Sequence, residues 1–136
     1  MAISRIDPPG MAFTGMSQVV VADGWLQVSG QVALREGQIV GLGDPSAQAE
    51  QCFANLLGVL EAAGAGPAQV VKLVCYLTER SAYAGYAAVR NRLFAAHPPA
   101  STVVIVKELL MPGLLMEVEA LARLPATPDP HEGDRR

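Results

Sequence analysis

The chain has 136 residues, 51% of them hydrophobic and 17% charged, and a formal net charge of −3 at pH 7. This length is typical of one domain with a single core, and the lack of any basic run argues against nucleic acid as the main partner. No apolar run reaches the ~18 residues of a membrane span and the N-terminus has no signal-peptide pattern, so we expect a cytoplasmic protein without a membrane segment.

The first predicted element is a β-hairpin. Residues 17–22 (SQVVVA) and 25–29 (WLQVS) are rich in β-branched residues, and Asp23-Gly24 between them is typical of a tight turn. A further short strand pair is expected within residues 31–42, around the sequence REG. The N-terminal half of the chain therefore predicts β-structure before any helix.

The first helix is predicted from its start signal. Asp44 is suited to the N-cap position and Pro45 to the first helical position, while Gly64 is suited to end the helix. Apolar residues follow Asp44 at helical spacing up to Ala63. A short turn at Pro67 should then lead into a strand over residues 70–77.

The second helix is predicted to start with Ser81 as its cap and to run to about His97, where Pro98 and Pro99 end it. Two last strands are predicted over residues 102–109 and 114–124, joined by a Met-Pro-Gly turn. The stripe of this helix that we expect to be buried consists of Tyr83, Tyr86, Val89, the stem of Arg90, Leu93 and Phe94.

The last strand carries two carboxylates in an apolar setting. Since side chains alternate along a strand, Met116, Val118, Ala120 and Ala122 should form a core face. The other face carries Glu117 and Glu119 between two leucines. Such a face is too acidic for a core and too apolar for an ordinary solvent-facing edge.

The order of elements predicts an α+β fold in which two helices cover one face of a mixed β-sheet. The other face has no partner within the chain, and the mean hydropathy of +0.28 is high for a small domain. We therefore expect copies of the chain to cover it. Residues 1–124 should form this one domain, and the Pro-rich tail of residues 125–136 should be disordered.

Few residues suggest metal or cofactor chemistry. Cys52 and Cys75 lie in apolar periodic segments and should be reduced core residues. His97 and His131 have no second ligand at metal spacing, and no glycine-rich phosphate loop is present. We therefore predict neither a metal nor a cofactor.

Residues 15–124 resemble the Rid family, the reactive intermediate deaminases also called YjgF-like proteins. The resemblance rests on "SGQ" at 29–31, on "AQAEQCFANLLGVLEAAGAGPAQVVKLVCYLTE", on the Pro-Ala after the second helix and on the closing "PGLLMEVEALA". It implies a chorismate-mutase-like α+β fold and a homotrimer with inward-facing sheets. It also implies small-molecule clefts between neighbouring subunits.

The same resemblance implies an activity, the hydrolysis of enamines or imines to a ketone and ammonia. It points to Glu117 as the catalytic carboxylate and to Ser29, Gly30 and Gln31 as lining of the cleft. A partly desolvated carboxylate has a raised pKa and can exchange protons near neutral pH, and a neighbouring charge on Glu119 would raise it further. For Glu119 itself, a salt bridge or a solvated rim position is the favoured interpretation.

This chain departs from the family at two substrate-binding positions. The family's deaminases carry an arginine after the Pro-Ala, which holds the substrate carboxylate, but the position falls here on Ala100 or Ser101. The family's N-terminal tyrosine is replaced by Ser17. The usual means of binding a 2-aminoacrylate-type substrate is therefore missing.

Two classes of function follow. The first is an imine or enamine deaminase whose substrate lacks a carboxylate or binds it in another way. The second is a non-catalytic trimer that binds a small metabolite or assists a pathway. Whether Arg5, Arg90 or Arg92 projects into the cleft would discriminate between them.

Overall fold

The structure is a computed structural model that describes residues 2–125; the predicted disordered tail, apart from Pro125, lies outside the described residues. The strands are β1 (Ile3–Ile6), β2 (Val19–Ala22), β3 (Trp25–Val32), β4 (Leu34–Arg35), β5 (Gln38–Ile39), β6 (Val70–Leu77), β7 (Ala100–Ile105) and β8 (Met116–Arg123). The α-helices are α1 (Pro45–Ala62) and α2 (Tyr83–Phe94), and the 3-10 turns are η1 (Pro67–Gln69) and η2 (Arg80–Ala82).

Six strands form one mixed sheet in the order β1-β2-β3-β8-β6-β7, and β4 pairs with β5 beside it. Among the strand pairs of residues 2–125, the edge pair β6–β7 alone is parallel, because α2 carries the chain back across the sheet between them. The predicted mixed α+β fold is confirmed. The closing strand β8 lies in the middle of the sheet, between β3 and β6.

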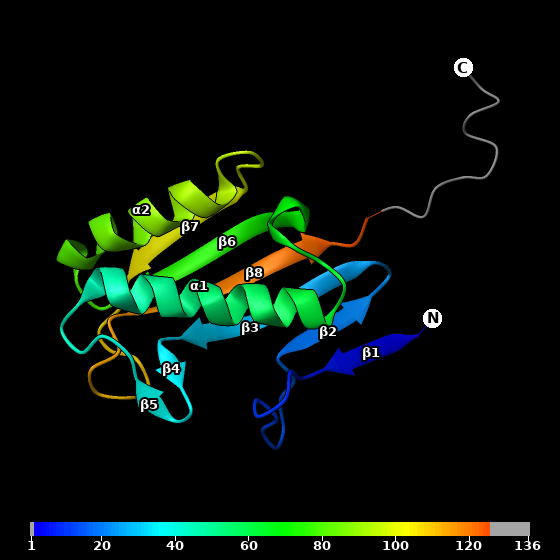
Figure 1. The fold of residues 1–136 in the computed structure, drawn as a ribbon, viewed down its shortest axis with the longest axis horizontal. Helices are drawn as coiled ribbons and strands as arrows, with labels where there is room; N and C mark the ends of the chain where they lie inside the picture. Colours follow the sequence, from blue (N-terminus) through cyan, green and yellow to red (C-terminus); the bar gives the residue numbers. More distant parts are fainter. Residues whose placement is uncertain (1, 126–136) are drawn as a thin grey trace.

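Both helices cover the same face of this sheet, and α1 runs across β3 and β8 (Figure 1). The two helices meet through aromatic rings, with the Phe53 centroid 5.6 Å from that of Tyr86 and 5.8 Å from that of Phe94. The core face predicted for the last strand is confirmed, since Met116, Val118, Ala120 and Ala122 are all buried.

No helix of the described chain covers the other side of the sheet, which we call the open face. Register and alternation assign its side chains, which include Trp25, Gln27, Lys72, Val74, Tyr76, Thr102, Val104, Glu117, Glu119 and Leu121. Of these, Trp25 and Val104 are large apolar side chains that remain exposed. The open face is therefore mixed in polarity, with exposed apolar side chains that another copy of the chain would cover.

The first helix begins as predicted. The Asp44 side chain accepts a hydrogen bond from the Ala47 amide at 3.1 Å, and Pro45 occupies the first helical position. The helix ends at Ala62, and Gly64 follows with φ +82°, a value that glycine adopts without steric cost. The Asp23-Gly24 hairpin is also confirmed, with both residues at positive φ.

The prediction for the second helix is wrong at both ends. Ser81 lies in η2, and α2 starts one residue after Ala82, without a side-chain cap. Tyr83, the first residue of α2, is 42% exposed and is not part of the buried stripe, whereas Tyr86 is fully buried. The helix ends at Phe94 because the chain turns there towards β7, and the His97 amide donates to the Phe94 carbonyl at 3.1 Å.

The remaining strands also differ from the prediction at their ends. β1 was not predicted, since its sequence, ISRI, is short and mixed in polarity, and it exists through pairing with β2. β7 begins at Ala100 and ends at Ile105, earlier than predicted at both ends. Beyond it the chain forms the irregular loop that leads to β8.

The two cysteines are buried and unpaired, as predicted from their apolar segments. Burial raises the pKa of both thiols, to about 12 for Cys75. Within residues 2–125, no helix has the length and apolarity to cross a membrane. The same part of the chain holds no group of His, Cys, Asp and Glu side chains placed to bind a metal.

Candidate functional site

Glu117 occupies the centre of the open face. In the sheet it lies opposite Val32 of β3 on one side and Tyr76 of β6 on the other. Its side chain is half-buried, yet it makes no hydrogen bond or salt bridge with any group in residues 2–125. Its acceptor oxygens are therefore available to a water molecule or a ligand.

A β-bulge beside Glu117 gives the carboxylate its place. The pairing of β3 with β8 shifts register between Val28 and Gln31, so that Ser29 and Gly30 stand outside the regular ladder. A Cβ atom at Gly30 would overlap the Glu117 Oε1 atom and would lie 2.8 Å from its Cδ. The carboxylate thus lies directly against the Gly30 backbone, a position that only glycine leaves open.

The surroundings of Glu117 favour its neutral form. Burial raises the pKa of the carboxyl, and the negative charge of Glu119 two residues along raises it further. No arginine, lysine or histidine of residues 2–125 forms a salt bridge with it. The shift has the direction predicted from sequence, and a carboxyl that keeps its proton above the ordinary pKa is suited to proton transfer.

Glu119 has a partner that the sequence did not suggest. The Tyr76 hydroxyl donates a hydrogen bond to Glu119 Oε1, and this bond raises the pKa of the tyrosine. Within the described chain Glu119 therefore forms no salt bridge, and its side-chain partner is a tyrosine hydroxyl. Side chains alternate along β6, and its core side is formed by Leu73, Cys75 and Leu77. This alternation is the signal that could have placed Tyr76 on the open face.

Ser29 and Ser17 are joined to each other. The Ser29 hydroxyl donates to the Ser17 carbonyl at 2.6 Å, and the Ser29 amide donates to the Gln18 carbonyl at 2.9 Å. These bonds fix the bulge to the segment before β2. Gln31 is buried, with its Nε2 atom donating to Gln18 Oε1 at 2.7 Å, so its side chain faces the helix side of the sheet and not Glu117.

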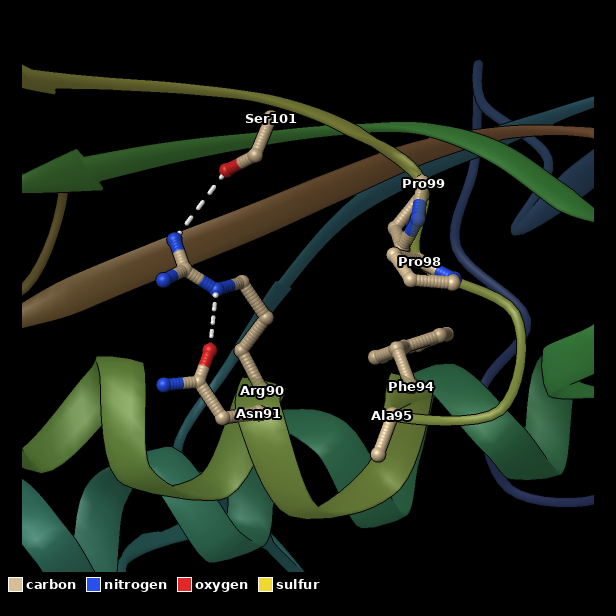
Figure 2. Close-up of a pocket in the computed structure, with 7 residues that line it drawn as sticks. All are labelled: Arg90, Asn91, Phe94, Ala95, Pro98, Pro99 and Ser101. Carbon is tan, nitrogen blue, oxygen red and sulfur yellow. Dashed lines mark hydrogen bonds between the residues drawn. The ribbon is translucent and has the colours of Figure 1, made fainter.

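Ala100 and Ser101 lie away from Glu117 within one chain. Ala100 pairs with Lys72, whereas Glu117 pairs with Tyr76, four residues further along β6. At the rise of a strand this separation is about 13 Å. Ser101 faces the helix side, where its hydroxyl accepts a hydrogen bond from Arg90 Nη1 at 3.2 Å (Figure 2).

Arg90 separates two hollows between α2 and the edge strand β7. One has a volume of about 440 Å³ and is bounded by the end of α2 and by Pro98 and Pro99 (Figure 2). The other has a volume of about 840 Å³. The larger hollow is lined by Leu77, Arg80, Ser81, Tyr83, Ala84, Arg90, Ser101, Val103 and Ile105.

Comparison with known proteins agrees with this architecture. The family described as Endoribonuclease L-PSP matches residues 9–124. The RutC family protein slr0709 of Synechocystis is 34% identical over 113 residues, which cover 80% of this chain and 85% of the relative. Protein HMF1 of Saccharomyces cerevisiae is 30% identical over 111 residues, covering 82% of this chain and 85% of HMF1.

Solved structures share the fold. The crystal structure of the yeast protein YEO7 has a TM-score of 0.85 at 27% identity and covers 91% of this chain and 100% of its own. The Rid-family protein YyfA of Yersinia pestis has a TM-score of 0.84 at 27% identity, with 90% of this chain and 100% of YyfA covered. The chain therefore belongs to the Rid family, the YjgF-like proteins of the L-PSP group.

Proposed function

We propose that the protein is an imine or enamine deaminase in which Glu117 carries the proton. The observation behind this proposal is the contact between the Glu117 carboxylate and Gly30, at a β-bulge in the middle of the open face. A half-buried carboxylate with a raised pKa and no partner in residues 2–125 is what proton transfer needs.

The proposed reaction uses water as the nucleophile. Glu117 takes a proton from a water molecule whose oxygen bonds to the imine carbon, while the C=N π-electron pair moves to nitrogen, which takes a proton from solvent. Glu117 then gives its proton to the nitrogen of the resulting carbinolamine. The C–N bond breaks, its electron pair leaves with ammonia, and the hydroxyl proton passes to solvent to give the ketone, so that the proton first taken from solvent is returned.

We further propose a homotrimer in which the open faces meet and clefts form between subunits. The exposed apolar side chains of the open face support burial by other copies, and the family resemblance supplies the number three. The cytoplasm stays our proposed location, although a relative from Schizosaccharomyces pombe is named as a mitochondrial protein.

The alternative is a non-catalytic trimer that binds a small metabolite in the same clefts or assists a pathway. The absence of a family-type arginine at Ala100 and Ser101 favours it, since the usual carboxylate anchor is lost. Cleavage of RNA, which the family's description names, is the least favoured activity. The chain carries a net charge of −3, and Glu117 and Glu119 would repel phosphates.

The test is turnover of a panel of imines generated in situ by an amino-acid oxidase. We expect the wild type to accelerate hydrolysis and Glu117→Gln, which keeps the size of the side chain, to lose the acceleration. Glu108→Gln, at an exposed glutamate outside the open face, is the matched control. Hydrolysis at the uncatalysed rate with every imine would rule out the deaminase and leave the binding protein.

A further inference from the structure

Arg90 is held in an unusual way for an arginine. Its guanidinium lies 5.8 Å from the ring centroid of Tyr83 and 5.4 Å from that of Tyr86. Its hydrogen bonds go to neutral oxygens only, namely Asn91 Oδ1 at 3.1 Å, Ser101 Oγ at 3.2 Å and the Tyr83 hydroxyl at 3.4 Å. The first two distances lie near the long end of the usual range for such hydrogen bonds, and the third lies beyond it.

The contrast with Arg92 in the same helix is clear. Arg92 donates both Nη atoms to the Glu50 carboxylate at 2.7 Å each, which is the geometry that guanidinium groups favour. Arg90 forms no salt bridge within residues 2–125, and N–H donors of its guanidinium remain unused. The Arg90 guanidinium is thus held by two aromatic rings but has no carboxylate partner in the described chain, so it is free to bind an anion.

The lining of the larger hollow beside Arg90 also favours an anion. Two arginines, Arg80 and Arg90, and no acidic side chain line it, together with the hydroxyl groups of Ser81, Tyr83 and Ser101. The Tyr86 hydroxyl, on the ring that lies 5.4 Å from the Arg90 guanidinium, is buried and has no hydrogen-bond partner in the described chain. A small carboxylate could bind there to the guanidinium with both oxygens and replace the long bonds to neutral groups.

We propose that Arg90 is a specificity-determining residue that binds the carboxylate of an imine or keto acid, delivered from helix α2 instead of from strand β7. Its contact with Ser101 places the guanidinium at the strand position where this chain has no arginine. The inference rests on the proposed function for the substrate class. The anion site itself follows from the contacts of Arg90.

One chain cannot bring this site to Glu117. Arg90 lies on the helix side of the edge strand, whereas Glu117 lies on the open face, two strands away across β6. A small substrate that contacts both must bind where β7 of one subunit meets the open face of a second. The complete site therefore needs two copies of the chain.

The experiment measures binding of a stable product, so that it does not depend on turnover. Pyruvate, and acetone as its carboxylate-free counterpart, are titrated into the oligomeric protein and followed by NMR chemical shifts. We expect the wild type to prefer pyruvate, and Arg90→Gln to weaken pyruvate binding about tenfold or more. Arg92→Gln, the control in the same helix, should bind pyruvate like the wild type.

A second variant covers the possibility that Arg90→Gln does not fold. Arg90→Lys keeps the charge and the packed stem but lacks the planar fork, so we expect pyruvate binding to weaken several-fold. Wild-type affinity for pyruvate in either folded variant, or equal binding of pyruvate and acetone by the wild type, would overturn the inference. Arg90-dependent pyruvate binding without any imine turnover would uphold it and reject the deaminase.

Discussion

At the scale of single residues, the missing side chain of Gly30 decides where the Glu117 carboxylate lies. In Gly30→Ala the new methyl group would overlap Glu117 Oε1 and displace the carboxylate, whose flexible end can move. We expect imine turnover to fall by about 100-fold, as is typical for a displacement of ~1 Å in an active site. The free energy of unfolding should change little, and chemical denaturation checks this.

The control for Gly30→Ala is Gly58→Ala, which also adds one methyl group but has no atom within 4 Å of the new Cβ. It should leave turnover unchanged. Wild-type turnover in Gly30→Ala would show that the position of the Glu117 carboxylate does not matter for the reaction, and the proposed role of the bulge would be lost.

The charge of Glu117 should also affect stability in a pH-dependent way. Because burial raises its pKa in the folded state above the ordinary value of 4.5, the folded chain binds the proton more tightly than the unfolded chain. The stabilisation from the bound proton is complete below the unfolded pKa and is lost as pH rises through the folded pKa. Glu117→Gln, which is always neutral, avoids this loss.

We therefore expect Glu117→Gln to gain stability over the wild type as pH rises above the ordinary carboxyl pKa of 4.5. The gain should stay below ~1 kcal/mol, because solvent screens a half-exposed carboxylate. Urea denaturation of both proteins across this range measures it. A stability difference that is constant with pH would show that the pKa of Glu117 is not raised.

At the scale of elements, two glycines in the helices should respond to alanine with opposite signs. Gly58 in α1 faces open space, so Gly58→Ala should stabilise the fold by ~0.5–1 kcal/mol through helix propensity. A Cβ at Gly85 in α2 would lie 2.9 Å from the Ser46 amide nitrogen and 3.0 Å from the Pro45 carbonyl carbon. Since these are backbone atoms of α1, Gly85→Ala should destabilise by ~1–3 kcal/mol.

Melting temperatures of the two alanine variants and the wild type provide the measurement. The expected order is Gly58→Ala, wild type, Gly85→Ala, from most to least stable. If Gly85→Ala were as stable as Gly58→Ala, the close approach of α2 to the start of α1 would not be a constraint on the fold.

The same elements explain what the sequence could predict. The Asp44 cap and the alternation from Met116 to Ala122 are local patterns, and both were correct. Ser81 was a misleading start signal for α2, and β1 is held by its pairing with β2, so local patterns located neither. Helix and strand ends are the part of a fold that local patterns locate least well.

The candidate site likewise has features that local sequence patterns indicate and features that depend on the tertiary structure. Glu117 and Glu119 interrupt a strand of apolar residues, so the pattern singled out the pair, and the family resemblance chose Glu117 between them. The bond between Tyr76 and Glu119 joins residues 43 positions apart, and only the sheet register brings them together. The reach of Arg90 to Ser101 likewise depends on how α2 lies beside β7.

At the scale of the whole molecule, we expect contacts of the open face to hold the oligomer together, and the proposed clefts to depend on that oligomer. Leu121 lies between Glu119 and Arg123 on β8, beside Gln27 of β3 and Lys72 of β6. Leu121→Glu would bury a third carboxylate on a strand that already carries two, without a hydrophobic contact in return. We expect this variant to dissociate to monomers in sedimentation equilibrium, whereas the wild type sediments as a trimer.

The control is Leu42→Glu, at an apolar residue that is 71% exposed in the loop after β5 and is not on the open face. It should sediment as the wild type does. Because the proposed clefts need two subunits, dissociated Leu121→Glu should also lose imine turnover while Glu117 and Gly30 keep their contact. A monomeric wild type, or a monomeric variant with full turnover, would mean that one open face performs the reaction alone.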